Sequence, residues 1–429
     1  MLDVESGSVF EVDYATYFFV SCGEAQARDK FGDALIDEVK CELDELRVQG
    51  LLGTERVEPS KRRWDGAIKA MCLNVSHRCN MTCGYCFASG GDYGQAIDGI
   101  GHMSVDTALT AIEYLADNSG NRRNLEVDFF GGEPLLNMDA VRAAVSRGRE
   151  IERKTDKRFR FTLTTNGALL TDDIIEFVNS EISNIVISID GRPDVHNSVR
   201  KIRSGGGDSH AIVIDKTLEL IKRRRAAKYR EYYIRGTFTR DNLDFAEDVL
   251  YLKSKGFEHI SMEPVVLPSA HPLAIRSEDI GRISREYERL AGLVRDNKIS
   301  FFHFYLDLGG GPCESKRLVA CGAGYEYVAV DPCGDIWPCH QFVGRDGYRM
   351  GSVVSGVDKD KAEELSRLTL NDKPKCKECW AKYYCGGGCH ANAWNFNRDL
   401  QKPYELGCAI EKKRLECALW LKVKLSEVE

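Results

Sequence analysis

The stretch CNMTCGYC, residues 79–86, places three cysteines within eight positions, directly after the short apolar run of residues 71–75. Zinc sites and iron–sulfur clusters usually take four protein ligands, and disulfides take an even number of cysteines. Three thiolates can bind three irons of a [4Fe–4S] cube and leave the fourth iron open to a small molecule. The aromatic Tyr85 and the strand-like run before the motif favour such a cluster over a zinc site completed by a distant residue, or over three buried cysteines.

Strands and helices alternate from residue 71 to about residue 300. Amphipathic helices, such as 105–117, 138–154 and 244–256, lie between strand candidates at 72–76, 125–130, 159–165, 184–190, 232–238 and 259–265. Six βα units predict an α/β fold with a parallel sheet curved into a partial (β/α)6 TIM-type barrel. Such barrels carry their chemistry at the C-terminal ends of strands. CNMTCGYC, GGEP (131–134) and SIDG (188–191) all fall at these ends.

Two further parts flank the predicted barrel of residues 71–300. Residues 1–13 alternate in polarity around a Ser-Gly pair and predict a β-hairpin, and two helical patterns follow, the clearer at 31–52. We interpret residues 1–55 as a winged-helix-like module and residues 56–70 as a linker. Residues 301–429 form a Cys-rich domain that ends in a helix at 416–425. Because this domain has little other regular structure, we expect metals bound by its cysteines to cross-link it.

Composition excludes several classes of partner. The net charge of −7 argues against nucleic acid, and no apolar run approaches the roughly 20 residues of a membrane span. The acidic first twenty residues do not resemble a secretory signal. We therefore expect a cytoplasmic protein, in which most of the 16 cysteines bind metals rather than form disulfides. The basic run at 221–230 is interpreted as a solvated helix face.

Nine cysteines lie between Cys313 and Cys408. The stretch CKECWAKYYCGGGC, residues 376–389, has the spacing Cys-x2-Cys-x5-Cys-x3-Cys, with three glycines that permit tight wrapping around a metal. Two zinc sites would use about eight of the nine cysteines, so their number leaves a structural zinc ribbon open. Four cysteines outside the metal patterns are predicted to be small buried apolar side chains: Cys22, Cys41, Cys72 and Cys417.

Taken together, the three barrel motifs resemble those of radical S-adenosylmethionine (SAM) enzymes. The resemblance implies that Cys79, Cys83 and Cys86 hold a [4Fe–4S] cluster whose open iron chelates SAM, and that reduction cleaves SAM to a 5′-deoxyadenosyl radical. The residues implied to surround SAM are Tyr85, Gly131, Gly132, Glu133, Pro134, Ser188, Asp190 and Arg200. Their types suit this role, because glycine lets the backbone approach a ligand, a glutamate can accept hydrogen bonds from an ammonium group, and an arginine can pair with a carboxylate as a fork.

The C-terminal cysteines are similar to the SPASM domain of peptide-modifying radical SAM enzymes. That resemblance implies two auxiliary clusters, and therefore three [4Fe–4S] clusters in all. The outer cluster would be held by Cys376, Cys379, Cys385 and Cys408, and the inner one by Cys321, Cys339 and Cys389. Cys313 or a thiolate of the substrate would be the fourth ligand of the inner cluster. Cys333 falls outside the pattern and is interpreted as a bystander.

Three stretches, CFASGGDYG (86–94), PCGDIWPCHQFVG (332–344) and CWAKYYCGGGC (379–389), resemble maturases that form thioethers in cysteine-rich ribosomal peptides, the SCIFF or ranthipeptide type. Sulfatase-maturing relatives carry an aspartate where this chain has His340. The resemblance implies a Cys-containing precursor peptide whose leader binds residues 1–55, and an electron donor such as flavodoxin or ferredoxin. The alternatives are another radical peptide modification (carbon–carbon cross-linking, epimerisation, decarboxylation or sulfatase-type oxidation) and a non-enzymatic electron carrier or zinc scaffold.

Overall fold

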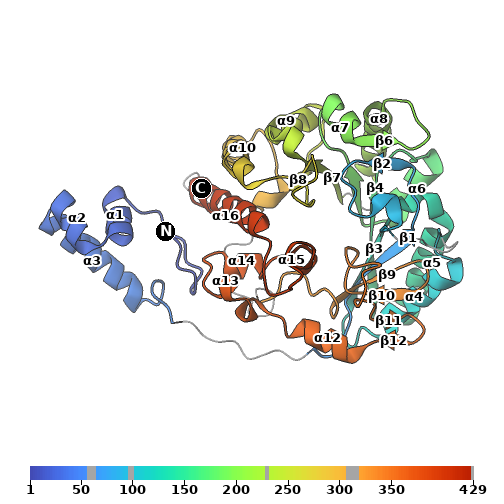
Figure 1. The fold of residues 1–429 in the computed structure, drawn as a ribbon, viewed down its shortest axis with the longest axis horizontal. Helices are drawn as coiled ribbons and strands as arrows, with labels where there is room; N and C mark the ends of the chain where they lie inside the picture. Colours follow the sequence, from blue (N-terminus) through green and yellow to red (C-terminus); the bar gives the residue numbers. More distant parts are fainter. Residues whose placement is uncertain (56–63, 95–100, 228–230, 306–317, 427–429) are drawn as a thin grey trace.

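A ten-stranded sheet forms the centre of the computed structural model, which describes residues 1–55, 64–94, 101–227, 231–305 and 318–426 (Figure 1). Six of its strands run parallel in the order β1-β3-β4-β5-β7-β8, which confirms the six parallel strands expected from the sequence. Their bounds are β1 (Ala70–Ser76), β3 (Asn124–Gly131), β4 (Arg158–Thr165), β5 (Asn184–Ser188), β7 (Glu231–Phe238) and β8 (Ile260–Pro264).

Helices follow most of these strands and cover one face of the sheet. Their bounds are α4 (Val105–Asp117), α5 (Met138–Lys154), α6 (Asp172–Glu181), α7 (Pro193–Val199), α8 (Ser209–Arg224), α9 (Phe245–Ser254) and α10 (Ile280–Arg295). Along β3, Leu125, Val127 and Phe129 are fully buried, while Asp128 and Phe130 alternate with them and stay partly exposed. Since side chains of a strand alternate between faces, the apolar core lies between sheet and helices. The more polar face lines the inside of the curved sheet.

A short second sheet of two strands joins the cysteine motif to the segment that follows SIDG. Strand β2 (Met81–Cys83) lies inside CNMTCGYC, and β6 (Arg200–Ile202) follows α7. The two strands pair antiparallel, with Cys83 opposite Arg200. This pairing brings the cysteine motif to the segment that follows SIDG, across more than a hundred residues of chain.

The C-terminal part extends the central sheet, which the sequence did not predict. Strand β9 (Tyr327–Val330) runs parallel to β1, and β10 (Asp335–Trp337), β11 (Gly351–Ser352) and β12 (Gly356–Val357) continue antiparallel from it. The helices that follow are α12 (Lys359–Ser366), α13 (Pro374–Lys377), α14 (Lys382–Cys385), α15 (His390–Asn397) and α16 (Glu405–Ser426). The expected terminal helix is therefore present but begins at Glu405, and a residue ahead of its apolar run already binds α10, where Arg414 Nε donates to the Tyr287 hydroxyl at 3.0 Å.

The N-terminal residues 1–55 form a turn closed by the single bridge Leu2↔Val9, followed by three helices: α1 (Tyr14–Cys22), α2 (Glu24–Phe31) and α3 (Asp33–Val48). The expectation of two helices was wrong, because Gly23 and Gly32 adopt φ values of +92° and +84° and separate the segments. Only a residue without Cβ takes such angles freely. The expected linker includes residues 56–63, which lie outside the described residues.

Two predictions about single residues need correction. Cys72 and Cys417 are buried as predicted, but Cys22 and Cys41 are exposed on the N-terminal helices. Arg224, inside the basic run interpreted as solvated, is 1% exposed and donates hydrogen bonds to the carbonyls of Ile182 and Glu231. Within the described part of the chain, no helix is both long enough and apolar enough to span a membrane.

The N-terminal segment is attached to the C-terminal part by Glu5. Its carboxylate accepts from Lys382 Nζ at 2.5 Å and from the Tyr383 hydroxyl at 2.6 Å, at the start of α14. The Lys382 side chain is only 7% exposed, whereas the second contact, Glu11 with Lys424 at 3.0 Å, lies in solvent. The N-terminal residues therefore meet helix α14, which ends at Cys385, in the region where Figure 1 shows α13 and α14.

The substitution Glu5→Gln is expected to weaken this attachment. Losing a charge-assisted hydrogen bond to a buried ammonium costs about 2 kcal/mol, so the backbone amides of Asp3 and Phe10 should exchange with deuterium at least tenfold faster. Glu11→Gln is the control, since an exposed pair contributes about 1 kcal/mol or less, and its exchange rates should stay near those of the wild type. Equal rates in both variants would contradict the assignment of the attachment to Glu5.

Candidate active site

The three cysteines of CNMTCGYC follow β1 and lie near one another. Burial raises the pKa of Cys79 to about 12, and the Cys83 and Cys86 sulfurs add to this rise. Backbone amides are directed at the sulfurs: Met81 N lies 3.4 Å from Cys79 Sγ, and Gly90 N lies 3.3 Å from Cys86 Sγ. Such amide donors favour a negatively charged sulfur.

The donor set fits a cluster better than a single ion. Among the described residues, no three Cys, His, Asp or Glu side chains converge closely enough to hold one metal ion. In a [4Fe–4S] cube, by contrast, each cysteine binds a different iron, so the sulfurs stand further apart. Because burial holds the pKa of Cys79 near 12 and that of Cys83 near 11, these thiols need a metal to become thiolates at neutral pH.

The glycines of GGEP pack β3 against the backbone that leads into the cysteine motif. Gly131 has a φ of +129°, and a Cβ there would lie 2.3 Å from Ser76 O. A Cβ on Gly132 would lie 2.3 Å from Arg78 O, and its own amide donates to Ser76 O at 2.7 Å. The close approach permitted by these glycines is thus to residues 76–79, so GGEP positions the cysteines.

Glu133 is fully buried and already holds three hydrogen bonds. Its carboxylate accepts from Thr165 Oγ1 at 2.7 Å, from Asn166 N at 2.8 Å and from Leu135 N at 3.0 Å. Burial raises the pKa of Glu133, and these donors partly offset the rise. Pro134 is buried and begins the short helix η2 (Pro134–Asn137), which directs Glu133 inward.

Asn166, which the sequence reasoning missed, links Glu133 to the cysteines. Its side-chain amide donates to Asn80 Oδ1 at 2.8 Å and lies 3.7 Å from Cys79 Sγ, while its backbone amide binds Glu133. Its position could have marked it as a site residue, because Asn166 directly follows β4, the strand that comes after GGEP in the chain.

Asp190 and Arg200, both expected beside SAM, pair with each other. Arg200 Nε lies 3.1 Å from Asp190 Oδ2, and the same carboxylate accepts from the Tyr85 hydroxyl at 2.5 Å and from Thr237 N at 3.0 Å. Burial lowers the pKa of Arg200, but the Asp190 carboxylate more than compensates, and the pKa rises well above its usual value. Since Arg200 Nη1 also lies 3.9 Å from Cys83 Sγ, this buried group locks the cysteine motif to the ends of β5 and β7.

The substitution Asp190→Asn is expected to destabilise the protein by about 3–5 kcal/mol, because it leaves the buried Arg200 guanidinium unpaired. Urea unfolding followed by fluorescence measures the change. Asp244→Asn is the matched control: Asp244 pairs with Arg192 at 2.9 Å, but its side chain is 37% exposed, so we expect a loss of about 1 kcal/mol or less. A small effect of Asp190→Asn would show that the pair is not structural.

Ser188 ends β5, and its strand neighbour Arg235 points into the same interior face of the sheet. The Arg235 guanidinium is 56% exposed and lies 3.1 Å from Glu263 on β8. On β3, burial raises the pKa of Asp128 to about 6. Arg235, Glu263 and Asp128 are interior polar residues that carry no motif, and sequence reasoning missed them for that reason.

His340 joins the C-terminal domain to the opening of the barrel. Its ring centroid lies 5.5 Å from that of Phe87 and 5.0 Å from that of Phe130, and its Nδ1 lies 3.3 Å from the Tyr327 hydroxyl. Burial lowers the pKa of His340 to about 4, so the ring is neutral at pH 7. His340 follows Cys339 and Phe87 follows Cys86, so the two cysteine segments meet at this contact.

Tyr93 gives a second measure of this proximity. Burial raises its pKa well above the usual value, and the sulfurs of Cys72, Cys86 and Cys339 add to the rise. One phenol therefore lies near both a cysteine of the first motif and a cysteine of the expected inner set. Its ring packs against Phe87 at 6.1 Å.

The C-terminal cysteines gather in two groups. Burial raises the pKa of Cys339 to about 12, with added contributions from Cys389 and Cys321. Among the other four, burial and the neighbouring Cys376 and Cys379 raise the pKa of Cys408, and the pKa of Cys385 rises to about 12 through burial, with Cys408 and Cys376 among the further causes. These contributions show which cysteines lie near one another, and the assignment to an inner and an outer cluster stays a prediction. Cys313 lies outside the described residues, and Cys333 is exposed.

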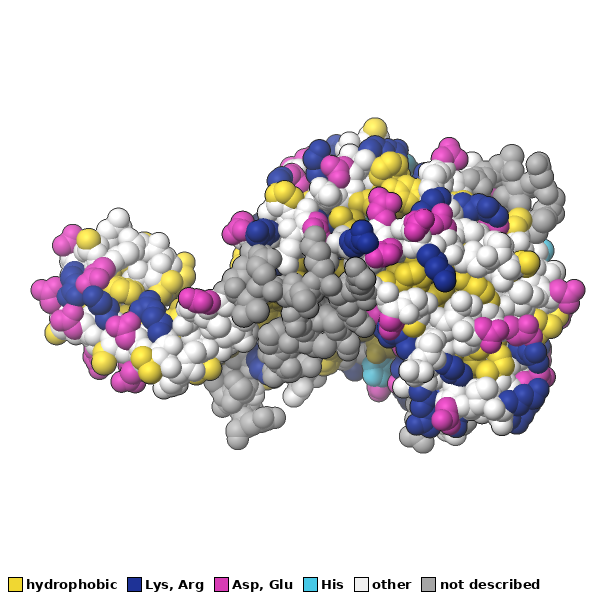
Figure 2. Space-filling view, turned by 90° about the horizontal axis from the view of Figure 1, so that it is seen from below, with side chains coloured by type: hydrophobic (Ala, Val, Ile, Leu, Met, Phe, Trp, Pro, Cys, Tyr) yellow, Lys and Arg dark blue, Asp and Glu magenta, His cyan; other side chains and the backbone are white. Residues whose placement is uncertain are grey.

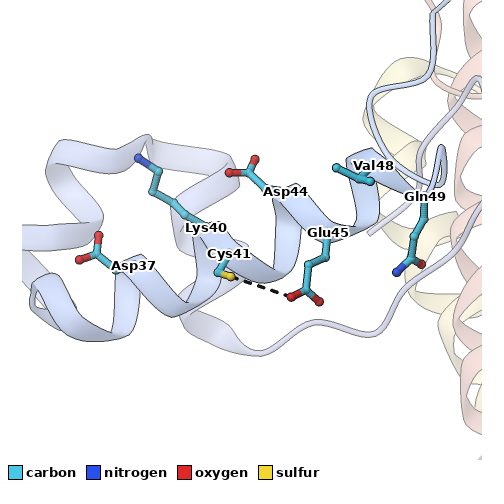
Figure 3. Close-up of a pocket in the computed structure, with 7 residues that line it drawn as sticks. All are labelled: Asp37, Lys40, Cys41, Asp44, Glu45, Val48 and Gln49. Atoms are coloured by element: carbon cyan, nitrogen blue, oxygen red, sulfur yellow. Dashed lines mark hydrogen bonds between the residues drawn. The ribbon is translucent and has the colours of Figure 1, made fainter.

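A separate hollow lies along α3, well away from these cysteines (Figure 3). It is lined by Asp37, Lys40, Cys41, Asp44, Glu45, Val48 and Gln49. The Cys41 sulfur lies 4.0 Å from Glu45 Oε1, and both residues project from the same helix face. Its open, acidic lining offers no arrangement for chemistry.

Comparison with known proteins agrees with this geometry. Residues 73–248 match the family model described as the Radical SAM superfamily. This region is a radical SAM domain, and it contains the cysteine motif, GGEP and the Asp190–Arg200 pair.

Its curated relatives include peptide and protein maturases. The radical SAM cyclopropyl synthase TigE of Paramaledivibacter caminithermalis is 24% identical over 340 residues, covering 75% of this chain and 68% of that protein. A cysteine-type anaerobic sulfatase-maturating enzyme of Clostridium novyi is 22% identical over 339 residues, covering 74% of this chain and 86% of that enzyme.

Solved structures share the fold. Native anSMEcpe with bound AdoMet aligns with a TM-score of 0.67 at 20% identity, over 84% of this chain and 99% of that one. Streptococcus suis SuiB bound to precursor peptide SuiA aligns with a TM-score of 0.55 at 16% identity, over 92% of each chain. The alignments extend beyond the radical SAM domain into the parts that flank it.

Proposed function

We propose that this chain is a radical SAM maturase that forms thioether cross-links between a cysteine sulfur and a carbon of an acceptor residue in a ribosomally made precursor peptide. Cys79, Cys83 and Cys86 would hold the SAM-binding cluster. Cys321, Cys339 and Cys389 would hold an inner auxiliary cluster, and Cys376, Cys379, Cys385 and Cys408 an outer one. A flavodoxin or ferredoxin would supply the electrons.

The contact between His340 and Phe87 carries the proposal. It joins the segment of Cys339 in the C-terminal domain to the cysteine loop of the radical SAM domain, with Tyr93 near sulfurs of both segments. A substrate sulfur that completes the inner set would therefore lie beside the opening where SAM binds. A chain that performed only electron transfer or zinc storage would not need such a junction next to a SAM site.

The reaction removes two hydrogens from the peptide. The cluster held by Cys79, Cys83 and Cys86 would supply, with SAM, a 5′-deoxyadenosyl radical able to take a hydrogen atom from the acceptor carbon. Formation of the carbon–sulfur bond would release the thiol proton and one electron, for which the clusters held by the C-terminal cysteines would be the acceptor. Among this chain's own residues, Phe87, Phe130 and Tyr327 surround His340 and exclude water from the opening. His340 is half-buried, and because its pKa is lowered to about 4 its ring is neutral at pH 7 and adds no charge to the opening.

The N-terminal residues 1–55 would bind the leader of the precursor. Helix α1 exposes Tyr14, Tyr17 and Val20, at 58%, 59% and 54% of their surface, and Figure 2 shows hydrophobic side chains on the lobe at the left. Exposed aromatic side chains on a small module are typical of peptide-binding surfaces. A leader could also add as a strand beside the turn closed by Leu2 and Val9.

The test uses the full-length protein, loaded anaerobically with iron and sulfide, with SAM, a reductant and a Cys-rich precursor peptide encoded beside its gene. We expect 5′-deoxyadenosine, and a peptide lighter by two hydrogens for each cross-link, with one cysteine per cross-link no longer open to alkylation. A lighter peptide with every thiol free would indicate carbon–carbon cross-linking or oxidation instead, and an unchanged mass with inverted residues would indicate epimerisation. Stoichiometric zinc without iron would exclude the radical reaction.

A further inference from the structure

Lys373 is a lysine buried inside the C-terminal domain. Its side chain is 1% exposed, and its ammonium donates to Gly387 O at 2.7 Å. It stands directly before α13, where its own carbonyl accepts from Cys376 N at 2.9 Å. An ammonium has three donors, and a single carbonyl gives it no compensating charge.

The position of Lys373 ties it to both cysteine groups. Its backbone binds Cys376 of the outer set. Its side chain binds the Gly387 carbonyl, in the short turn that connects Cys385 of the outer set with Cys389 of the inner set. A Cβ on Gly387 would lie 3.5 Å from Lys373 Cδ, so the side chain packs along this turn. The lysine therefore lies where the two groups adjoin.

The groups that most favour the charged form of Lys373 are sulfurs. Burial lowers its pKa, and Cys376, Cys385, Cys389 and Cys321, two from each set, raise it again. A buried ammonium without a negative partner costs several kcal/mol. Cysteines bound to metal are thiolates and would provide the missing charge.

We propose that Lys373 is a shared charge-compensating residue for the two auxiliary iron–sulfur sites, fixed between them by Gly387 and stabilising the more negative, reduced form of each. It acts on the sites through space and binds neither metal nor substrate. The proposal rests on the auxiliary clusters proposed above, and it adds that one cation couples their reduction potentials.

The test compares reduction potentials, measured by electron paramagnetic resonance during anaerobic redox titration, in loaded full-length protein. Lys373→Gln removes the charge and keeps a donor for Gly387 O, whereas Lys373→Arg keeps the charge. Lys375→Gln is the matched control: this neighbouring lysine is 71% exposed and pairs with Glu405 in solvent, where charge is screened. Iron content of the wild type tests the underlying proposal separately, with about twelve irons expected for three cubes.

In Lys373→Gln we expect reduction of both auxiliary clusters to become about tenfold less favourable. This lowers each reduction potential by about 59 mV for one electron. Lys373→Arg and Lys375→Gln should stay within about twofold of the wild type (about 18 mV). Loss of iron in Lys373→Gln but not in Lys373→Arg would also support the proposal, because charge would then hold the sites. Unchanged potentials at full iron content in Lys373→Gln, or iron loss in both variants, would overturn it. A wild type with only four irons would instead refute the auxiliary clusters themselves.

Discussion

A chain in which Cys79, Cys83 and Cys86 are all replaced by alanine is expected to lose SAM cleavage while keeping about eight of about twelve irons. These sulfurs lie together at the end of β1, held by amides of Met81 and Gly90. Without them no iron can present an open position to SAM, and the rate should fall by about 10³-fold or more. Formation of 5′-deoxyadenosine and iron content, measured on the same preparation, report the two effects.

The control for this variant is Cys333→Ala, since Cys333 is exposed and lies outside both C-terminal groups. It should bind iron and cleave SAM as the wild type does. Full SAM cleavage by the triple variant would contradict the assignment of the first cluster. Loss of all iron in the triple variant would mean that the C-terminal groups do not bind clusters independently.

The substitution Cys389→Ala is expected to abolish cross-linking and leave SAM cleavage largely intact. Cys389 is near both Cys339 and Cys321, so its loss removes one of three sulfurs from the inner set, together with about four irons. We expect at least a 10²-fold fall in cross-linked peptide, but a fall of less than about tenfold in 5′-deoxyadenosine, because Cys79, Cys83 and Cys86 are unaffected. Mass spectrometry of the peptide and quantification of 5′-deoxyadenosine measure the two rates in one reaction.

Cys333→Ala again serves as the control. Cross-linking at the wild-type rate by Cys389→Ala, with about eight irons bound, would exclude a role for the inner set in forming the carbon–sulfur bond. Equal losses of both products would show instead that the inner set supports SAM cleavage itself.

The periodicity of the sequence was enough to predict the six parallel strands and the bounds of α4 and α5. It was not enough for the N-terminal helices, although Gly23 and Gly32 mark both breaks, because glycine within a helical pattern does not by itself reveal a positive φ. The short apolar run at 327–330 gave no sign of pairing with β1, since such pairing depends on contacts between distant parts of the chain.

Residues of the candidate site could be named from the sequence where they belong to a motif. Their contacts and their burial could not, because these depend on how distant parts of the chain pack. The motif identified Asp190 and Arg200, but not that they pair with each other beside Tyr85. The burial of Lys373 and Arg224 could not be predicted, because a lysine or arginine in sequence is expected at the surface. His340 was visible as a departure from a pattern, while its contact with Phe87 and Phe130 required the structure.

The continuity of the sheet has a consequence for how this molecule can be divided. Strand β1, whose end leads into the cysteines, lies between β3 on one side and β9 on the other, so half of its ladder comes from beyond residue 320. Cutting the chain at residue 300 would leave β1 as an unprotected edge of apolar residues, prone to pair with another molecule. The barrel and the cysteine-rich C-terminal domain are therefore not separable domains. They share one sheet and form one folding unit.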